Sequence, residues 1–338
     1  MEETTLGNEL TENKEVSWKV LDIDVYGTIT SPTDKETHSV VIFVAGSGPT
    51  DRDWCSPLLP GTNGSGKLLA ETLASQGFVT LRYDKLASGS HVRENISKLV
   101  GKISMQSHME ELKSAVETIT AEKNVNKDSV FVITNSEGAI HAVNYQLQPK
   151  SNRFNRLILT GAPGKAVGEL GRSQIVDQIK HLPNADILMQ QYDNAIADFL
   201  KNKSMLIDAS LPEGIKLLLQ SLQNPASLPF SRELWMYRLA EYIDKVKEPI
   251  LVVIGKKDIQ VDWKVDGKIL ENSTSNNASV SFVYPENANH VLKHEDKPRE
   301  TINAQYVPLH YNAPDMELDM EASNAIFVWL KKQSQARA

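Results

Sequence analysis

The chain has a single cysteine, Cys55, among its 338 residues. One cysteine cannot form an intrachain disulfide or build a cysteine-rich zinc or iron–sulfur site, so the sequence excludes both. A chain of this length with 41% hydrophobic residues can bury a large core without such crosslinks. Nothing beside Cys55 in the sequence indicates an activated thiolate, and we expect a packed thiol with no catalytic role.

Long hydrophobic runs and an excess of basic residues are also missing. The clearest apolar runs, residues 39–45 and 249–254, are far too short to span a bilayer. Lysine and arginine number 36 against 43 aspartates and glutamates, a formal charge of −7. We therefore expect no membrane span and no nucleic-acid partner. The first residues lack the basic and apolar regions of a signal peptide, which favours a cytoplasmic protein unless an export signal has been removed.

Short apolar strands alternate with helical segments along most of the chain. Such alternation predicts the α/β class, here a mostly parallel sheet with helices on both faces. A first pair of strands is expected at residues 18–30, with a break at Gly27. The other expected strands are residues 39–45, 78–83, 129–134, 156–160, 249–254 and 280–284. Helical spacing marks residues 64–76, 105–123, 136–148 and 320–332.

Residues 165–247 interrupt this alternation with several helical segments and no convincing strand. We predict one α/β domain made of residues 16–164 and 248–338, with residues 165–247 inserted as a helical cap. Residues 1–15 are expected to be a flexible N-terminus. Ligands of an open α/β sheet bind at the carboxyl ends of its strands, so this cap would cover the site.

Residues 133–139, ITNSEGA, lie where a buried strand meets a helix. A serine in such a turn projects its hydroxyl above the sheet edge, where the helix N-terminus and backbone amides stabilise negative charge. Ser136 is therefore a candidate nucleophile, and Gly138 meets the need for a small residue in a crowded turn. The alternative interpretation is an ordinary serine cap, with Glu137 as a favourable acid in the first helical turn.

Two later loops supply partners for a nucleophilic serine at the same sheet edge. Asp258 and His290 follow the last two expected strands. The chain order serine, aspartate, histidine is the order expected for a serine hydrolase on such a sheet. We predict that His290 is the general base and that Asp258 orients its imidazole. His294 is a second candidate base, but His290 is preferred because it directly follows a turn of small residues.

These motifs, together with the glycine-rich loop at residues 46–53, GSGPTDRD, resemble the α/β-hydrolase superfamily of the serine esterase and lipase type. The loop is similar to the Gly-Ser-Gly-Pro loop of bacterial esterases. The resemblance implies a serine hydrolase that cleaves a small or medium carboxylic ester through an acyl-enzyme intermediate. Its triad would be Ser136, His290 and Asp258, and it implies no cofactor and no metal.

The resemblance also implies an oxyanion hole made of backbone N–H groups. One donor would be Glu137, directly after the candidate nucleophile. The second would come from the glycine-rich loop, with Ser47 as the first choice and Gly48 as the alternative. Glycines suit this place because they let the backbone approach a substrate closely.

Thr134 and Asn135 depart from the family's pattern, which usually has glycine and histidine at these two positions. This departure favours one alternative, a catalytically weakened α/β-hydrolase-fold binding protein. A second alternative keeps the triad and cleaves amides, peptides or thioesters. The sequence separates none of these and leaves the oligomeric state open.

Three other motifs have an ordinary explanation. Residues 61–67, GTNGSGK, match the spacing of a phosphate-binding loop, but Leu68 replaces its metal-binding serine or threonine. His290 and His294 have the spacing of two metal ligands on a helix, but no glutamate stands between them as in a zinc hydrolase. The charged residues 51–53 are expected to form an ion-pair cluster that holds their loop.

Overall fold

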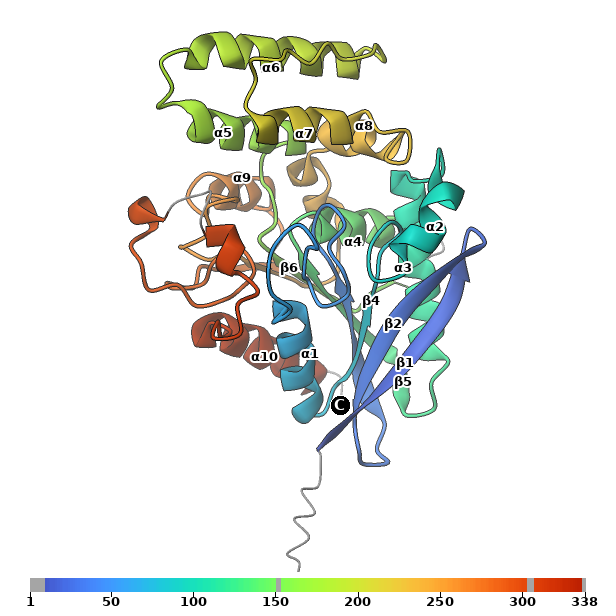
Figure 1. Ribbon diagram of the computed structural model, residues 1–338. Coiled ribbons are helices and arrows are strands. Elements are labelled where there is room, and N and C mark those ends of the chain that lie inside the picture. The colour runs from blue at the N-terminus through green and yellow to red at the C-terminus, as the bar shows by residue number, and fades with distance from the viewer. Residues whose placement is uncertain (1–9, 150–152, 303–306, 336–338) are drawn as a thin grey trace, which may run out of the picture.

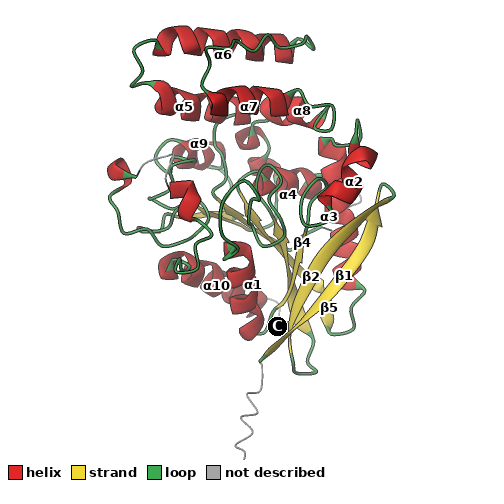
Figure 2. Ribbon diagram, in the orientation of Figure 1, coloured by secondary structure: helices red, strands yellow, loops and turns green. Residues whose placement is uncertain are grey.

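The computed structural model describes residues 10–149, 153–302 and 307–335. Its centre is an eight-stranded sheet, drawn in yellow in Figure 2. The strands are β1 (Thr11–Val20), β2 (Ile23–Pro32), β3 (His38–Val44), β4 (Val79–Tyr83), β5 (Val125–Asn135), β6 (Arg156–Thr160), β7 (Ile250–Val253) and β8 (Val280–Val283). They lie in the order β1-β2-β4-β3-β5-β6-β7-β8. β2 pairs antiparallel with β1 and β4, and the other neighbours are parallel, which confirms the predicted fold class.

Helices cover the sheet, and all four segments with helical spacing contain one. The α-helices are α1 (Ser65–Ser75), α2 (Val92–Leu99), α3 (Met105–Thr120), α4 (Gly138–Gln146), α5 (Val167–Ile179), α6 (Ala185–Leu200), α7 (Glu213–Leu222), α8 (Phe230–Trp235), α9 (Asp266–Ser273) and α10 (Met320–Gln335). Short 3₁₀ turns are η1 (Leu239–Glu241), η2 (Ile243–Lys245), η3 (Arg299–Thr301) and η4 (Val307–His310). The sequence pattern did not indicate α2 and α9, which are short and largely polar.

The first hairpin turns at Leu21 and Asp22, whose φ angles are 50° and 64°. The predicted break at Gly27 is wrong, because Gly27 lies inside β2. A Cβ at that position would come within 2.8 Å of the carbonyl oxygen of Arg82 on β4. This glycine therefore permits a close approach between neighbouring strands instead of forming a turn.

The start of β1 also differs from the expected flexible terminus. β1 begins at Thr11, which pairs with Pro32 of β2, so residues 11–15 are strand. Residues 1–9 lie outside the described part of the chain. The beginning of β1 is mostly solvent-exposed and is held by the backbone ladder. Its sequence consequently lacks the apolar signal that marks the buried strands.

The core consists of two hydrophobic clusters, one on each face of the sheet. Val40, Ile42 and Val44 of β3 pack with residues of α3, α4 and α9. Val41 and Phe43 point to the opposite face and pack with α1 and α10. Successive strand residues alternate between faces, so a strand buried on both must be apolar throughout. This explains the unbroken apolar run that the sequence shows here.

Between β6 and β7 the chain forms α5, α6, α7 and α8, which lie together above the rest of the molecule in Figure 1. These helices have a hydrophobic cluster of their own, which includes Tyr192, Phe199 and Trp235. Leu170 and Phe230 pack against the larger cluster of the sheet. The helices occupy the segment that we interpret as a cap, and its limits at residues 165–247 stay a prediction.

The strands from β4 to β8 in the sheet order run parallel, so their carboxyl ends lie at one edge of the sheet. The loops that follow β3, β5, β7 and β8 carry the residues that the sequence singles out. Loops at this edge form the binding crevice of open α/β sheets.

Candidate active site

Ser136 occupies the sharp turn between β5 and α4 in a left-handed conformation, with a φ angle of 52°. Its backbone N–H donates to the carbonyl of Thr160 at 2.8 Å, which ties the turn to the end of β6. Left-handed backbone costs a residue with a Cβ on the order of 1 kcal/mol. Functional sites are one place where such strain is retained, and ordinary turns are another. A Cβ on Gly138 would lie 2.6 Å from the carbonyl oxygen of Val44, so only glycine fits this turn.

The two residues that depart from the usual motif are built into this edge. Thr134 is fully buried, and its carbonyl accepts the Thr160 hydroxyl at 2.7 Å. Asn135 is also buried, and its Nδ2 donates to the carbonyl of His290 at 3.0 Å. A threonine at this place is therefore compatible with the tight turn. Asn135 links the serine turn directly to the loop of the candidate base.

Asp258 and His290 form a buried pair in which the aspartate Oδ2 lies 2.8 Å from the histidine Nδ1. Asp258 is fully buried and His290 is 5% exposed. The other carboxylate oxygen accepts the N–H groups of Gln260 and Val261 at 2.8 and 2.9 Å, which fixes its orientation. A carboxylate at Nδ1 favours the tautomer with the proton there, and leaves Nε2 as the proton acceptor.

Two glycines let the Asp258 and His290 loops come together. Gly255 follows β7, and a Cβ there would lie 1.9 Å from the carbonyl oxygen of Ala288. Gly161 follows β6 with a φ angle of 55°, and a Cβ there would lie 3.1 Å from the His290 ring. Sequence reasoning missed both residues as well as Asn135. Their position directly after a buried strand, or beside Ser136, was the available signal.

His294, the second candidate base, lies in a different environment. Its Nδ1 is 3.0 Å from Asp319 and its Nε2 is 2.8 Å from Asp296, and its side chain is 41% exposed. Hydrogen bonds to both carboxylates raise the pKa of His294. With both ring nitrogens engaged, this histidine joins its loop to the start of α10 and has no nitrogen left to accept a proton from a serine.

The glycine-rich loop lies against the serine turn. A Cβ on Gly46 would come within 2.8 Å of Asn135 Oδ1 and 3.4 Å of Ser136 Cβ. Gly48 has a φ angle of 71°, and the Ser47 carbonyl accepts the Thr50 hydroxyl at 2.7 Å. The residues with the predicted oxyanion donors, Ser47 or Gly48 and Glu137, are thus on neighbouring segments around Ser136.

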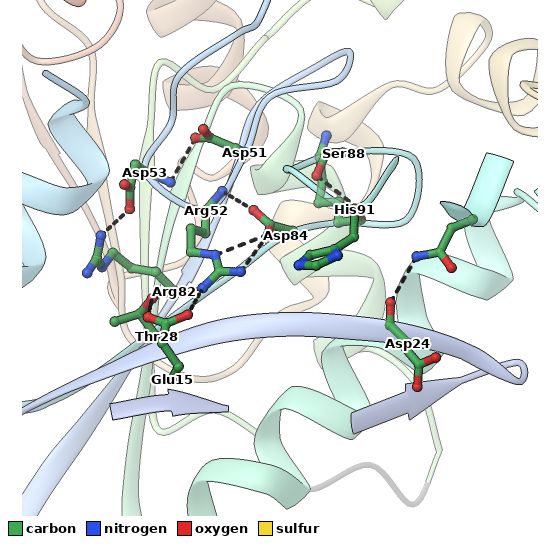
Figure 3. Close-up of polar contacts among 12 residues, drawn as sticks. Glu15, Asp24, Thr28, Asp51, Arg52, Asp53, Arg82, Asp84, Ser88 and His91 are labelled. Carbon is green, nitrogen blue, oxygen red and sulfur yellow. Dashed lines mark hydrogen bonds and ion pairs between the residues drawn. The ribbon is translucent and has the colours of Figure 1, made fainter. Parts of the chain in front are cut away.

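The charged part of this loop forms the expected ion-pair cluster, shown in Figure 3. Arg52 contacts the Asp84 carboxylate through Nη2 at 2.7 Å and through its backbone N–H at 2.8 Å. It also reaches Glu15 of β1 at 2.6 Å. Arg82 of β4 pairs with Asp53. These contacts anchor the loop to the antiparallel side of the sheet.

The carboxyl group of Asp51, in the same loop, has a raised pKa. Burial, together with the nearby Asp53 and Asp84 carboxylates, raises the pKa of Asp51 to about 6. Its Oδ1 accepts the backbone N–H groups of Asp53 and Cys55, both at 2.9 Å. Because the folded-state pKa exceeds the unfolded value, Asp51 favours folding below about pH 4, and that contribution is lost as the pH rises through about 6.

We expect Asp51→Asn to remove this pH dependence. An asparagine keeps the Oδ1 acceptor and cannot ionise. The unfolding free energy of the variant, relative to that of wild type, should therefore rise by about 2 kcal/mol between pH 4 and pH 7. Urea unfolding at a series of pH values measures the difference. Asp315→Asn, at an exposed position, reports the general effect of removing one carboxylate. Parallel pH curves for wild type and Asp51→Asn would contradict the prediction.

Cys55 and the glycines after it serve packing. Cys55 is buried, and burial raises the pKa of its thiol to about 12, so it is not an activated thiolate. A Cβ on Gly64 would lie 2.0 Å from the carbonyl oxygen of Asp53, and one on Gly66 would lie 2.8 Å from Trp54. Close approach to this loop accounts for two of the three glycines of the phosphate-loop-like motif, and the third, Gly61, lies against the Asn312 carbonyl.

Neither a metal cluster nor a membrane helix is found in the described part of the chain. Within residues 10–149, 153–302 and 307–335, no group of three or more His, Cys, Asp or Glu side chains is arranged to hold a metal ion. Over the same ranges, every helix is too short or too polar to cross a bilayer.

The strand order and the edge described above define an α/β-hydrolase fold, as the predicted resemblance implied. No family model matches the sequence. Est1E from Butyrivibrio proteoclasticus has a similar structure, with a TM-score of 0.54 and 13% identity over 95% of this chain and 99% of that one. Proline iminopeptidase from Mycobacterium smegmatis gives a TM-score of 0.55 and 14% identity, over 96% of this chain and 100% of that one.

A curated protein is similar in sequence as well. Esterase EstD of Thermotoga maritima is 24% identical over 267 residues, which is 79% of this chain. The match spans 57% of the length of EstD.

Proposed function

We propose that this protein is a serine hydrolase that cleaves a small or medium carboxylic ester. The observation that carries the proposal is the convergence at one sheet edge of a left-handed Ser136 and a buried Asp258–His290 pair, joined by Asn135. The similarity to EstD and Est1E supports ester hydrolysis. The substrate would be a small molecule, and the chemistry needs no cofactor.

In the proposed mechanism the Ser136 hydroxyl attacks the ester carbonyl while His290 Nε2 takes its proton. The oxyanion that forms accepts hydrogen bonds from backbone N–H groups of Glu137 and of Ser47 or Gly48. The imidazolium returns the proton to the leaving alcohol, and an acyl-enzyme remains. A water then gives a proton to His290 and attacks the acyl carbon. The imidazolium returns that proton to the Ser136 oxygen as the bond to the acyl carbon breaks and the acid leaves. Asp258 holds the imidazole and stabilises its cation.

A fluorophosphonate probe tests the proposal because it forms a covalent adduct with an activated serine. Intact-mass measurement should show one adduct, and peptide mapping should place it on Ser136. The Ser136→Ala variant should not react. Ser221→Ala, an exposed serine on α7, is the matched control and should react like wild type. A folded wild-type protein that stays unlabelled would overturn the proposed catalytic role and favour a binding protein.

Amide cleavage is the second candidate, because the structural similarity extends to a proline iminopeptidase. The same triad can transfer an acyl group from an ester, an amide or a thioester. A panel of p-nitrophenyl esters of increasing acyl length, an amino-acid anilide and an acyl-CoA separates these substrate classes. We expect the highest kcat/KM for a p-nitrophenyl ester.

A further inference from the structure

Lys85 is a buried lysine just after β4 whose side chain is only 4% exposed. Its ammonium donates to the carbonyl of Gly46 and to that of Gly48, the latter at 3.3 Å. It also lies 3.5 Å from the Glu137 carboxylate, itself 4% exposed. Lysine is almost never buried without a partner. Here its partners are the glycine-rich loop and the residue directly after Ser136.

The Glu137 carboxylate is ionised and held from a second side. His141, one turn further along α4, has its Nε2 3.0 Å from Glu137 Oε1. Burial alone would raise the pKa of Glu137, but Lys85 and His141 hold it well below its usual range. Burial and the neighbouring His108 lower the pKa of His141 to about 4, so its neutral ring can donate to the carboxylate. The buried ammonium therefore meets a full negative charge.

The Gly46 contact fixes the orientation of a peptide group. The C=O and N–H of a trans peptide point in opposite directions, and the Gly46 carbonyl shares its peptide plane with the Ser47 N–H. Because Lys85 holds that carbonyl, the Ser47 N–H points away from Lys85. Ser47 is the first-choice second donor, and Glu137 supplies the other donor. One ammonium thus contacts both segments with the predicted oxyanion donors.

Asp84, the residue before Lys85, holds the glycine-rich loop at its charged end. The Asp84 carboxylate binds the side chain and the backbone N–H of Arg52, as Figure 3 shows. Consecutive residues at the end of β4 therefore fix the loop at its glycines and at its charged end. Of these two residues, Lys85 is the one that contacts the glycine backbone.

We propose that Lys85 is a positioning residue that sets the two backbone donors of the oxyanion hole by binding the Gly46 and Gly48 carbonyls and the Glu137 carboxylate. The proposal rests on the proposed ester hydrolysis. The effect of Lys85 would fall on the transition state, because an oxyanion hole binds the developing negative charge more strongly than the ground-state carbonyl.

The test replaces Lys85 with methionine, which keeps the length of the side chain and removes the charge. We expect kcat to fall about 10²-fold, which is the loss in kcat that removal of one oxyanion donor typically causes. KM should stay nearly unchanged. A trifluoromethyl ketone, which forms a tetrahedral adduct, should lose affinity by the same factor as kcat/KM. Gln146→Met also replaces a buried polar side chain on α4, and it should lose stability while kcat stays at the wild-type value.

A double variant, Lys85→Met with Glu137→Gln, keeps the test decisive if the single variant does not fold. It removes both charges, so no unpaired charge is left buried, and it should show the same loss in kcat. A folded variant with wild-type kcat and ketone affinity would overturn the positioning role. If wild type itself neither reacts with the fluorophosphonate nor cleaves esters, the proposed function fails and the role of Lys85 fails with it.

Discussion

Asp258→Asn is expected to lower kcat by about 10⁴-fold while the protein stays folded. The asparagine Oδ1 can still accept the N–H groups of Gln260 and Val261, so the loop keeps its shape. Its amide NH₂ then faces His290 Nδ1 in place of a carboxylate oxygen. A donor at that place favours the tautomer with the proton on Nε2, and this nitrogen can then no longer take the proton of Ser136.

Steady-state kinetics with a p-nitrophenyl ester measure this loss, and circular dichroism checks the fold. Asp262→Asn is the matched control on the same loop, because Asp262 accepts backbone N–H groups and pairs with Arg299 at the surface. The control should keep kcat within about threefold of wild type. A folded Asp258→Asn variant that kept more than a tenth of the wild-type kcat would show that another group orients His290.

Gly255→Ala is expected to destabilise the fold by about 3 kcal/mol, at the upper end of what an added buried methyl usually costs. The new Cβ would overlap the carbonyl oxygen of Ala288, 1.9 Å away. This carbonyl is backbone and also accepts the Lys257 N–H at 3.1 Å, so it cannot rotate out of the way. The clash would push the Asp258 loop away from the His290 loop.

Urea unfolding measures the loss in stability, and kinetics on the folded fraction measure the effect on the site. A displacement of about 1 Å between catalytic groups can cost on the order of 10²-fold in rate. Gly214→Ala is the control, because no atom lies within 4 Å of a Cβ on this exposed glycine of α7. That change should leave stability equal or slightly higher. Unchanged stability in Gly255→Ala would mean that the two loops are not locked together.

The buried strands were predictable because their signal is local. The expected strand at residues 156–160 coincides with β6, whose five residues are all buried. The placement of Ser136, Asp258 and His290 at one edge followed from the strands, because parallel strands place their following loops at the same edge. The hairpin turn at Leu21 and Asp22 was missed because neither residue is a glycine or proline. Aspartate tolerates a left-handed backbone, so Asp22 is a weak signal of the turn, but Leu21 gives none.

The contacts that organise the site could not be predicted, because they join distant parts of the chain. Asn135 and His290 are separated by 155 positions, and nothing near either residue indicates the other. Lys85 and Glu137 resemble solvated surface charges when each is taken in its own sequence context. Only the fold shows that they are buried side by side.

The segment that we interpret as a cap has an evolutionary consequence. Its hydrophobic cluster, with Tyr192, Phe199 and Trp235, shares no buried residue with the two clusters of the sheet. Substitutions inside that cluster can repack these helices while the two clusters of the sheet keep their packing. The helices and the sheet can therefore change in sequence largely independently of each other during evolution, because substitutions without shared packing partners act nearly additively on stability.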